Sequence, residues 1–155
     1  MGMGDGLSGA HAALARLAGE WAGTYRLWLE PGVLRVQGDS HCSVRSVLPG
    51  RFVVIDYDWM DLDGPQLGCM LLGCNDEGRW EMAWVDSWHT QTAIMLCVGD
   101  TAIQVLGAYG AADEQWGWRT HIDATSPDAL TITAWNVTPA GDEAKATEAT
   151  YARMA

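Results

Sequence analysis

The pattern of apolar and polar positions changes near residue 19. Before it, small and apolar residues recur at helical spacing after Ser8, a residue type that caps helices, and Gly19 ends the pattern. The helical stripe consists of Ala12, Leu14, Leu17 and Ala18. After it, apolar and polar residues alternate with a period of two, which is typical of strands with one buried face. The pattern predicts one short helix followed by strands alone.

Turn residues divide the alternating region into short segments. Gly, Pro, Asn and Asp gather between the segments, as in Pro31-Gly32, Pro49-Gly50 and 75–78. The predicted strands are 21–30, 36–48, 52–60, 66–74, 79–87, 91–98, 102–109, 116–124, 129–138 and 145–153. Because most connections have hairpin length, we expect successive strands to pair in antiparallel fashion.

The first and last strands carry a matched pair of side chains. Trp21 begins the first strand and Arg153 ends the last. A cation can lie across an indole ring here only if these two strands are neighbours, which is the condition for a closed barrel. The sequence therefore predicts an all-β, up-and-down antiparallel barrel of about ten strands, with the N-terminal helix capping one end. Residues 1–6 are expected to be flexible and residues 7–155 to form a single β-barrel domain.

The net charge of the chain argues against some classes of binding partner. With a formal net charge of −11, the chain is poorly suited to nucleic acid or anionic membrane surfaces, which attract Lys and Arg. No apolar run approaches the roughly 20 residues of a transmembrane helix, and the first residues lack a signal-peptide pattern. The sequence predicts a cytoplasmic protein that binds neither nucleic acid nor membrane.

Residue types that hold metals lack metal-binding spacing. The four cysteines include no Cys-x-x-Cys pair and are expected to be small buried hydrophobes, and the four histidines show no His-x-x-x-His spacing. An acidic run lacks the glycine and terminal glutamate of a calcium loop, so we expect a solvated edge there. This run comprises Asp56, Asp58, Asp61 and Asp63. No cofactor or metal is expected.

One strand face combines large apolar groups with a carboxylate. The residues on this face are Trp80, Met82, Trp84, Asp86 and Trp88. Four apolar groups indicate that the face points inward, which would bury Asp86 and require a partner for it. Arg119, with His121 on the same face of a later strand, is the expected partner, although the alternate face of that strand also carries apolar residues. The alternative is an Asp86 that caps a turn at the barrel rim.

The last strand offers a second polar candidate. Arg153 is expected to close the barrel floor over Trp21; alternatively, Arg153 and Tyr151 hold an anionic head group such as a carboxylate. Tyr151 can serve a ligand in either case.

Several motifs together resemble a bacterial family known as domain of unknown function 1579, whose members are calycin-like β-barrels. The motifs are Leu17-x-Gly19-x-Trp21-x-Gly23, Leu48-Pro49-Gly50-Arg51-Phe52, Trp84-Val85-Asp86-Ser87-x-x-Thr90, Arg119 and Glu148-x-x-Tyr151-x-Arg153. The resemblance implies a ten-stranded barrel akin to fatty-acid-binding and haem-binding relatives, without a settled activity. Unlike the haem-binding barrels, the last strand has no histidine to serve as an axial ligand.

The main functional hypothesis is a barrel that binds a small hydrophobic or amphipathic molecule in its interior. The residues expected at this site are Tyr25, Met82, Trp84, Asp86, Arg119, His121 and Tyr151. One alternative is a filled barrel that acts as an interaction module, with exposed Trp28 or Trp135 on a homodimer face. Others are a small enzyme that uses Asp86 with His89 or His121, and a haem-binding barrel.

Overall fold

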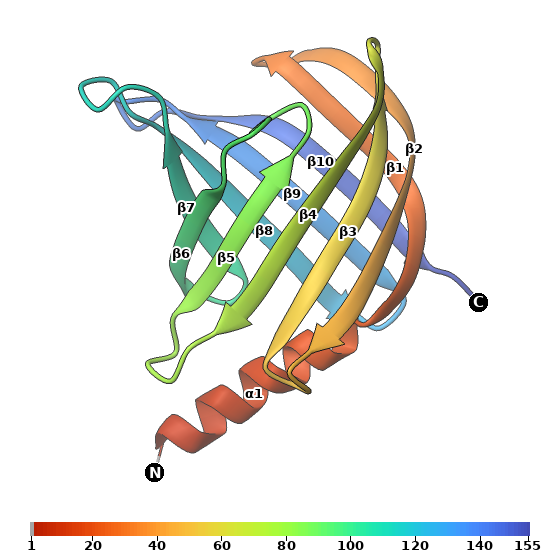
Figure 1. Cartoon of the computed structure of the whole chain (residues 1–155), viewed down its shortest axis with the longest axis vertical. Helices are drawn as coiled ribbons and strands as arrows, with labels where there is room; N and C mark the ends of the chain where they lie inside the picture. Colours follow the sequence, from red (N-terminus) through yellow and green to blue (C-terminus); the bar gives the residue numbers. More distant parts are fainter. Residues whose placement is uncertain (1) are drawn as a thin grey trace.

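Ten antiparallel strands close into one barrel, and a helix packs across one end of it (Figure 1). The computed structural model describes the backbone of residues 2–155 and the side chains of residues 9–155. The elements are α1 (Gly2–Leu17), β1 (Gly19–Glu30), β2 (Val33–Val47), β3 (Phe52–Asp61), β4 (Gly64–Cys74), β5 (Trp80–Asp86), β6 (Met95–Thr101), β7 (Gln104–Tyr109), β8 (Trp116–Ser126), β9 (Ala129–Val137) and β10 (Glu143–Arg153). Each strand pairs with its neighbours in the chain, and β1 pairs with β10. The predicted all-β barrel with one capping helix is confirmed.

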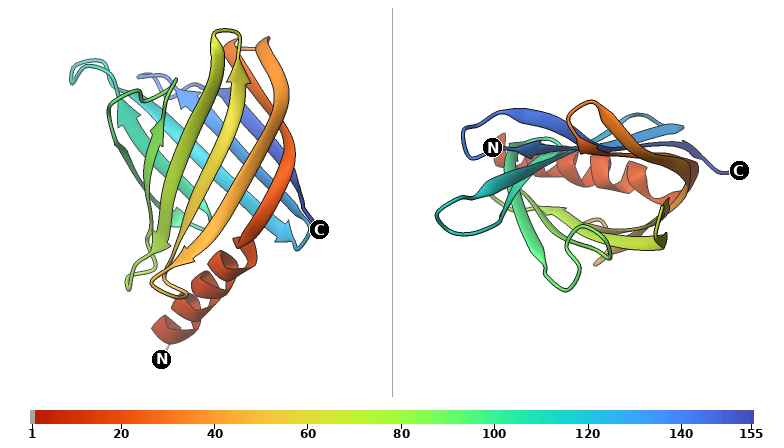
Figure 2. Two further views of the ribbon diagram at one scale, coloured as in Figure 1. Left: turned by 45° about the vertical axis from the view of Figure 1, so that its right-hand side comes forward. Right: turned by 90° about the horizontal axis from the view of Figure 1, so that it is seen from above.

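Helix α1 forms the floor of the barrel. Viewed from above, it lies behind the ring of strands (Figure 2). Leu14 and Leu17 are buried beneath the strands, and the Trp21 indole Nε1 donates to the Leu17 carbonyl at 2.9 Å. This bond fixes the start of β1 against the end of the helix.

The N-terminal end of α1 differs from the prediction. The helix begins at Gly2, so Ser8 lies within it and the prediction that Ser8 caps its N-terminus is wrong. Met1 and the side chains of residues 2–8 lie outside the described part of the chain. The flexibility expected of residues 1–6 stays a prediction.

The seam between β1 and β10 begins with Trp21 opposite Arg153. The Arg153 guanidinium carbon lies 4.2 Å from the centre of the Trp21 ring, and its terminal nitrogens donate to the carbonyls of Arg16 and Ala18, both at 2.7 Å. The predicted closure of the floor is confirmed. The alternative, in which Arg153 holds an anionic head group, is wrong because its donors are bonded to the backbone.

The connection between β5 and β6 lies at the opposite end of the barrel, which we call the mouth (Figure 1). The predicted strand 91–98 begins later in the structure: residues 87–92 fold into turns, and β6 starts only at Met95. The mouth therefore carries a structured loop where the sequence pattern predicts part of a strand.

At the helix end, aliphatic side chains fill the interior. Residues buried to 2% exposure or less in this part include Leu14, Leu17, Val53, Ile55, Leu72, Val105, Ile122 and Leu130. They come from the helix and from strands all around the barrel, because alternation turns every second side chain inward. This half forms the aliphatic part of the hydrophobic core, which continues toward the mouth through buried rings such as Trp59 and Trp84.

Candidate ligand-binding site

A cavity of about 520 Å³ opens at the mouth of the barrel. It lies within the range of about 300–1,000 Å³ that is typical of small-molecule sites. Strands β1, β5–β10 and the loop before β6 contribute to its wall, which is mainly aromatic and aliphatic. The lining residues are Leu27, Trp28, Leu29, Trp84, Trp88, His89, Thr90, Ala93, Ile94, Met95, Ala108, Tyr109, Gly110, Trp118, Asn136 and Ala146.

Stacked rings form the base of this cavity. Trp84 of β5 and Trp118 of β8 stack with ring centres 5.0 Å apart and an angle of 16° between their planes. The His89 ring lies 5.6 Å from Trp84 and 5.1 Å from Trp118, and Trp88 meets His89 edge-on at 4.7 Å. A planar molecule in the cavity could therefore stack on an aromatic base.

The loop after β5 holds His89 in this position through Asp86. Asp86 Oδ1 accepts from the backbone N–H groups of Trp88 at 2.9 Å and His89 at 3.0 Å. Thr90 Oγ1 accepts from the Asp86 N–H at 2.8 Å, and the Asp86 carbonyl accepts from the N–H groups of Thr90 and Gln91. Short polar side chains that bond to nearby backbone are typical of tight turns. The Asp86-Ser-x-x-Thr90 motif therefore positions the loop that carries His89.

The second oxygen of Asp86 orients the aromatic wall. Asp86 Oδ2 accepts from the Tyr57 hydroxyl at 2.6 Å and from the Trp59 indole at 3.2 Å, and the Trp84 indole donates to Tyr57 at 2.9 Å. Gly68 makes room for this network, because a Cβ at that position would overlap the Tyr57 ring. The buried carboxylate is thus served by four neutral donors, which suits a group that, when ionised, only accepts hydrogen bonds.

The prediction that Arg119 pairs with Asp86 is wrong. Arg119 lies on the outer face of β8, where it bonds to Glu143 at 2.8 Å and stacks 4.0 Å above the Trp135 ring. The reason is competition between the two faces of that strand: Trp118 and other residues with its parity occupy the inside. His121 shares the outward parity of Arg119 and does not line the mouth cavity.

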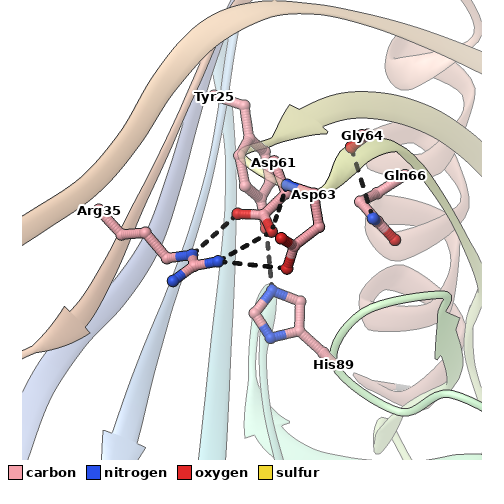
Figure 3. Close-up of polar contacts among 7 residues, drawn as sticks. All are labelled: Tyr25, Arg35, Asp61, Asp63, Gly64, Gln66 and His89. Atoms are coloured by element: carbon pink, nitrogen blue, oxygen red, sulfur yellow. Dashed lines mark hydrogen bonds and ion pairs between the residues drawn. The ribbon is translucent and has the colours of Figure 1, made fainter.

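A neutral pair, His89 and Tyr25, joins the base of the cavity to the interior. The Tyr25 hydroxyl lies 3.2 Å from His89 Nε2 (Figure 3). Burial lowers the pKa of His89 to about 4, despite the opposing effect of nearby Asp86, and burial raises the pKa of Tyr25 well above its usual value. At pH 7 Tyr25 can donate to an unprotonated Nε2, which assigns the His89 proton to Nδ1.

Beside this pair, an ion pair fixes the turn between β3 and β4. Arg35 donates from Nε to Asp61 Oδ1 at 2.9 Å and from Nη2 to Oδ2 at 3.1 Å, and Nη2 lies 3.5 Å from Asp63 (Figure 3). The hydrogen bonds from Arg35 lower the pKa of Asp61 to about 2. The expected solvated edge is thus wrong for Asp61, which is 3% exposed, and right for the other acidic residues of the run, which are exposed.

The remaining predicted site residues lie below the cavity base. Met82 is buried in the wall but does not line the mouth cavity. Tyr151 bonds to Ser40 Oγ at 2.7 Å, deep in the barrel. Tyr25, Tyr151 and Trp84 border a second space of about 20 Å³, which also receives the Thr120 hydroxyl. Within the described residues, this hydroxyl is the one buried side-chain oxygen or nitrogen without a hydrogen-bond partner.

Trp84 is thus the one predicted site residue that lines the mouth cavity. His89, Trp118 and Asn136 also line it and are missing from the predicted site. The Asp-Ser-x-x-Thr motif was the available signal for His89, because Asp and Thr at this spacing favour a turn that returns to the barrel. Trp28 and Trp135, expected to be exposed on a dimer face, are both partly covered.

The described residues provide neither a cluster of metal ligands nor a helix suited to a membrane. They contain no group of three or more His, Cys, Asp or Glu side chains that could hold a metal ion. Over the same part of the chain, no helix has the length and apolar character needed to cross a membrane.

Comparisons with known proteins extend the description of the fold. No curated protein matches the chain. The S-type phycobiliprotein lyase CPES from Guillardia theta is similar, with a TM-score of 0.52 and 13% identity over 92% of this chain and 90% of that chain. A DUF3598 protein of unknown function from Nostoc punctiforme aligns with a TM-score of 0.28 and 8% identity over 94% of this chain and 99% of that chain.

The lyase likeness concerns the fold alone and agrees with a calycin-like barrel. The family resemblance is confirmed, since the profile described as "Protein of unknown function (DUF1579)" matches residues 7–153. The chain belongs to the DUF1579 family.

Proposed function

We propose that the protein binds a small hydrophobic or amphipathic molecule in the mouth cavity. The observation that carries this proposal is the space of about 520 Å³ above the stacked Trp84 and Trp118 rings. A barrel filled from end to end would offer no such space. The ligand would lie entirely in the mouth half, because the space below the stacked rings is only about 20 Å³, close to the volume needed by one water.

The polar network supports binding rather than catalysis by Asp86. Both oxygens of this carboxylate are engaged, and Asp86 is not among the residues that line the cavity. Its bonds instead hold the rings and the loop in place, so that the site is largely formed before a ligand arrives.

The protein with a similar fold gives general support to the proposal of ligand binding. It is named a phycobiliprotein lyase, and its similar barrel is consistent with a small-molecule partner for this chain. A homodimer stays a prediction, as do the absence of nucleic-acid binding and a cytoplasmic location.

Two measurements test the proposal. The first compares the native and denatured masses of the protein purified from a related bacterial host; an excess mass that disappears on unfolding would identify a bound molecule. The second titrates the protein with N-phenyl-1-naphthylamine, an uncharged dye that fluoresces in apolar sites. We expect a dissociation constant on the order of 10 µM, which is ordinary for a ligand of this size.

A matched pair of variants on β6 localises the dye. Met95 lines the cavity, whereas its neighbour Leu96 points outward and is 73% exposed. Met95→Trp should fill part of the space and weaken dye binding at least about tenfold, and Leu96→Trp should leave it unchanged. The proposal fails if the folded wild-type protein shows neither excess mass nor dye binding, or if both variants bind the dye like the wild type.

A further inference from the structure

The wall of the mouth cavity is uncharged, whereas charged side chains lie around it. Among its lining residues, which all belong to the described part of the chain, there is no Asp, Glu, Lys or Arg. His89 is the one titratable imidazole in the wall, and it is neutral at pH 7. An ionic ligand would therefore find no counter-ion on the surface that it touches.

The nearest cations are already paired. Arg35 is held by Asp61 and Asp63, and Lys145 bonds to Glu148 at 2.8 Å. Arg119 lies outside the barrel with Glu143. Moving Arg35 toward a ligand would leave the buried Asp61 carboxylate uncompensated. The pairs of Lys145 and Arg119 are more exposed, and Glu148 keeps Arg26 as a second partner.

Two carboxylates, those of Asp86 and Asp61, lie close enough to His89 at the cavity base to affect its pKa. Asp86 is 2% exposed. Asp61 is paired with Arg35, whereas Asp86 is bonded to neutral donors only and no cation contacts it. Negative potential from a carboxylate in a site shielded from water opposes an incoming anion more strongly than it would at the surface. The net charge of −11 acts in the same direction at longer range.

The wall still offers neutral polar groups. The Tyr109 hydroxyl donates to Asn136 Oδ1 at 2.6 Å, which leaves the Asn136 amide nitrogen to donate to a ligand. The hydroxyl of Thr90, on the same wall, is already bonded to the Asp86 backbone, so the Asn136 amide is the neutral donor available to a ligand. This set suits a flat aromatic molecule with an uncharged hydrogen-bond acceptor.

We infer that the mouth cavity selects uncharged, planar aromatic molecules and discriminates against anionic ligands, including carboxylates of the fatty-acid type. The inference rests on the proposed function and narrows it to one ligand class. It also differs from the alternative drawn from the sequence, in which Arg153 and Tyr151 would hold an anionic head group.

Two dyes with the same ring system provide the test. N-phenyl-1-naphthylamine is uncharged, and 1-anilinonaphthalene-8-sulfonate carries one added sulfonate. For wild-type protein at pH 7.5 and moderate salt, we expect the uncharged dye to bind at least about 30-fold more tightly, because an unpaired charge is costly to bury. Equal affinities, or tighter binding of the sulfonate, would overturn the selectivity and leave the proposed function intact. Binding of neither dye would contradict the selectivity, and together with the absence of an excess native mass it would contradict the proposed function as well.

A lysine substitution in the cavity wall tests whether the wall itself causes the selectivity. Met95→Lys adds a cation to the wall, and we expect it to strengthen sulfonate binding about tenfold while weakening that of the uncharged dye. Leu96→Lys makes the same change in net charge on the outer face and should preserve the wild-type ratio. If the two lysine variants change the ratio equally, long-range charge rather than the cavity wall controls binding, and the inference is wrong. The wild-type dye pair decides the question alone if Met95→Lys does not fold.

Discussion

The two ends of the barrel interior use the same strand alternation in different ways. At the helix end, aliphatic side chains such as Leu72 and Leu130 are fully buried and fill the space between the strands. At the mouth, the inward positions carry large rings, and about 520 Å³ remains open between them. The helix end is filled with aliphatic side chains, whereas the mouth borders an open cavity.

Hydrogen bonds explain how rings can border an open space and still hold fixed positions. An aliphatic side chain is held only by contacts on all sides. The indoles of Trp59 and Trp84 are instead tied by their N–H groups to Asp86 and Tyr57. These bonds set the orientation of both rings: Trp84 lines the cavity, and Trp59 packs against the lining residues Trp88 and His89. We therefore expect the two ends to respond differently to the same kind of mutation.

The largest difference should come from side-chain truncation. Leu72→Ala at the helix end should lower the free energy of unfolding by about 3 kcal/mol, because a cavity replaces packed atoms. Ile94→Ala at the mouth, where the side chain is 67% exposed, should cost less than about 0.5 kcal/mol. Urea denaturation followed by tryptophan fluorescence measures both. Equal losses would contradict the division of the interior into a packed half and an open half.

A smaller effect should appear in the pH dependence of stability. The folded-state pKa of His89 is about 4, below the usual 6.5, so the unfolded chain binds more protons between these values. Stability is then complete above about pH 6.5 and falls as the pH drops toward 4. We expect a loss of about 2 kcal/mol over this interval, less than the full shift implies because the ring is partly exposed.

His89→Gln tests this assignment. The variant should show a flatter pH profile than the wild type between pH 7 and 4.5, measured by urea denaturation at each pH. His121→Gln removes a histidine from the outer face and is the matched control. If the stability of His89→Gln changes with pH as steeply as that of the wild type, a group other than His89 causes the pH dependence of stability.

The smallest effect concerns the ion pair beside the mouth. The pKa of Asp61 falls to about 2 in the folded state, from 3.8. Its contribution is therefore present above about pH 4 and is lost as the pH falls toward 2. Arg35→Met should cost about 1 kcal/mol at pH 7, since the pair is partly hydrated, and this difference from wild type should shrink below pH 3.

Arg26→Met, which removes a 3.5 Å pair with Glu148 on the outer face, provides the comparison for Arg35. It should cost less than about 0.5 kcal/mol, as exposed pairs generally do. Thermal unfolding at pH 7 and pH 3 is sufficient to separate the two variants. A loss at Arg35 that is independent of pH would indicate lost packing against Trp88 rather than lost charge.

Much of the fold could be predicted because alternation and turn residues act locally. All ten strands were expected near their observed positions, and the pairing of Trp21 with Arg153 fixed the closure. The burial of Asp86 followed from its large apolar neighbours on the same face of β5. These features depend on residues that are close in sequence or on one specific side-chain pair.

The partners of Asp86 could not be predicted in the same way. Arg119 was the expected partner of Asp86, and a turn cap was the alternative. The two backbone N–H groups of that turn do bond to Asp86, and Tyr57 and Trp59 of β3, which no sequence pattern indicates, complete its partners. Whether a Tyr or Trp points its polar atom at a carboxylate depends on the three-dimensional arrangement of the strands. His89 enters the sequence-based hypotheses only in the enzyme alternative and not in the predicted ligand site, because periodicity describes strands and this residue is positioned by a turn.

The seam between β1 and β10 also determines when the molecule can be completed during its synthesis. β1 is the first strand to be made and can pair with β2 soon afterwards, but its other edge has no partner until β10 has been translated. The same holds for the carbonyls at the end of α1, which receive the Arg153 guanidinium. Until then the growing chain is an open sheet with an unpaired edge and a partly uncovered apolar face, the form most prone to aggregation. A nascent chain that stops before Arg153 would remain in that state, so full-length translation is itself a condition for a closed barrel.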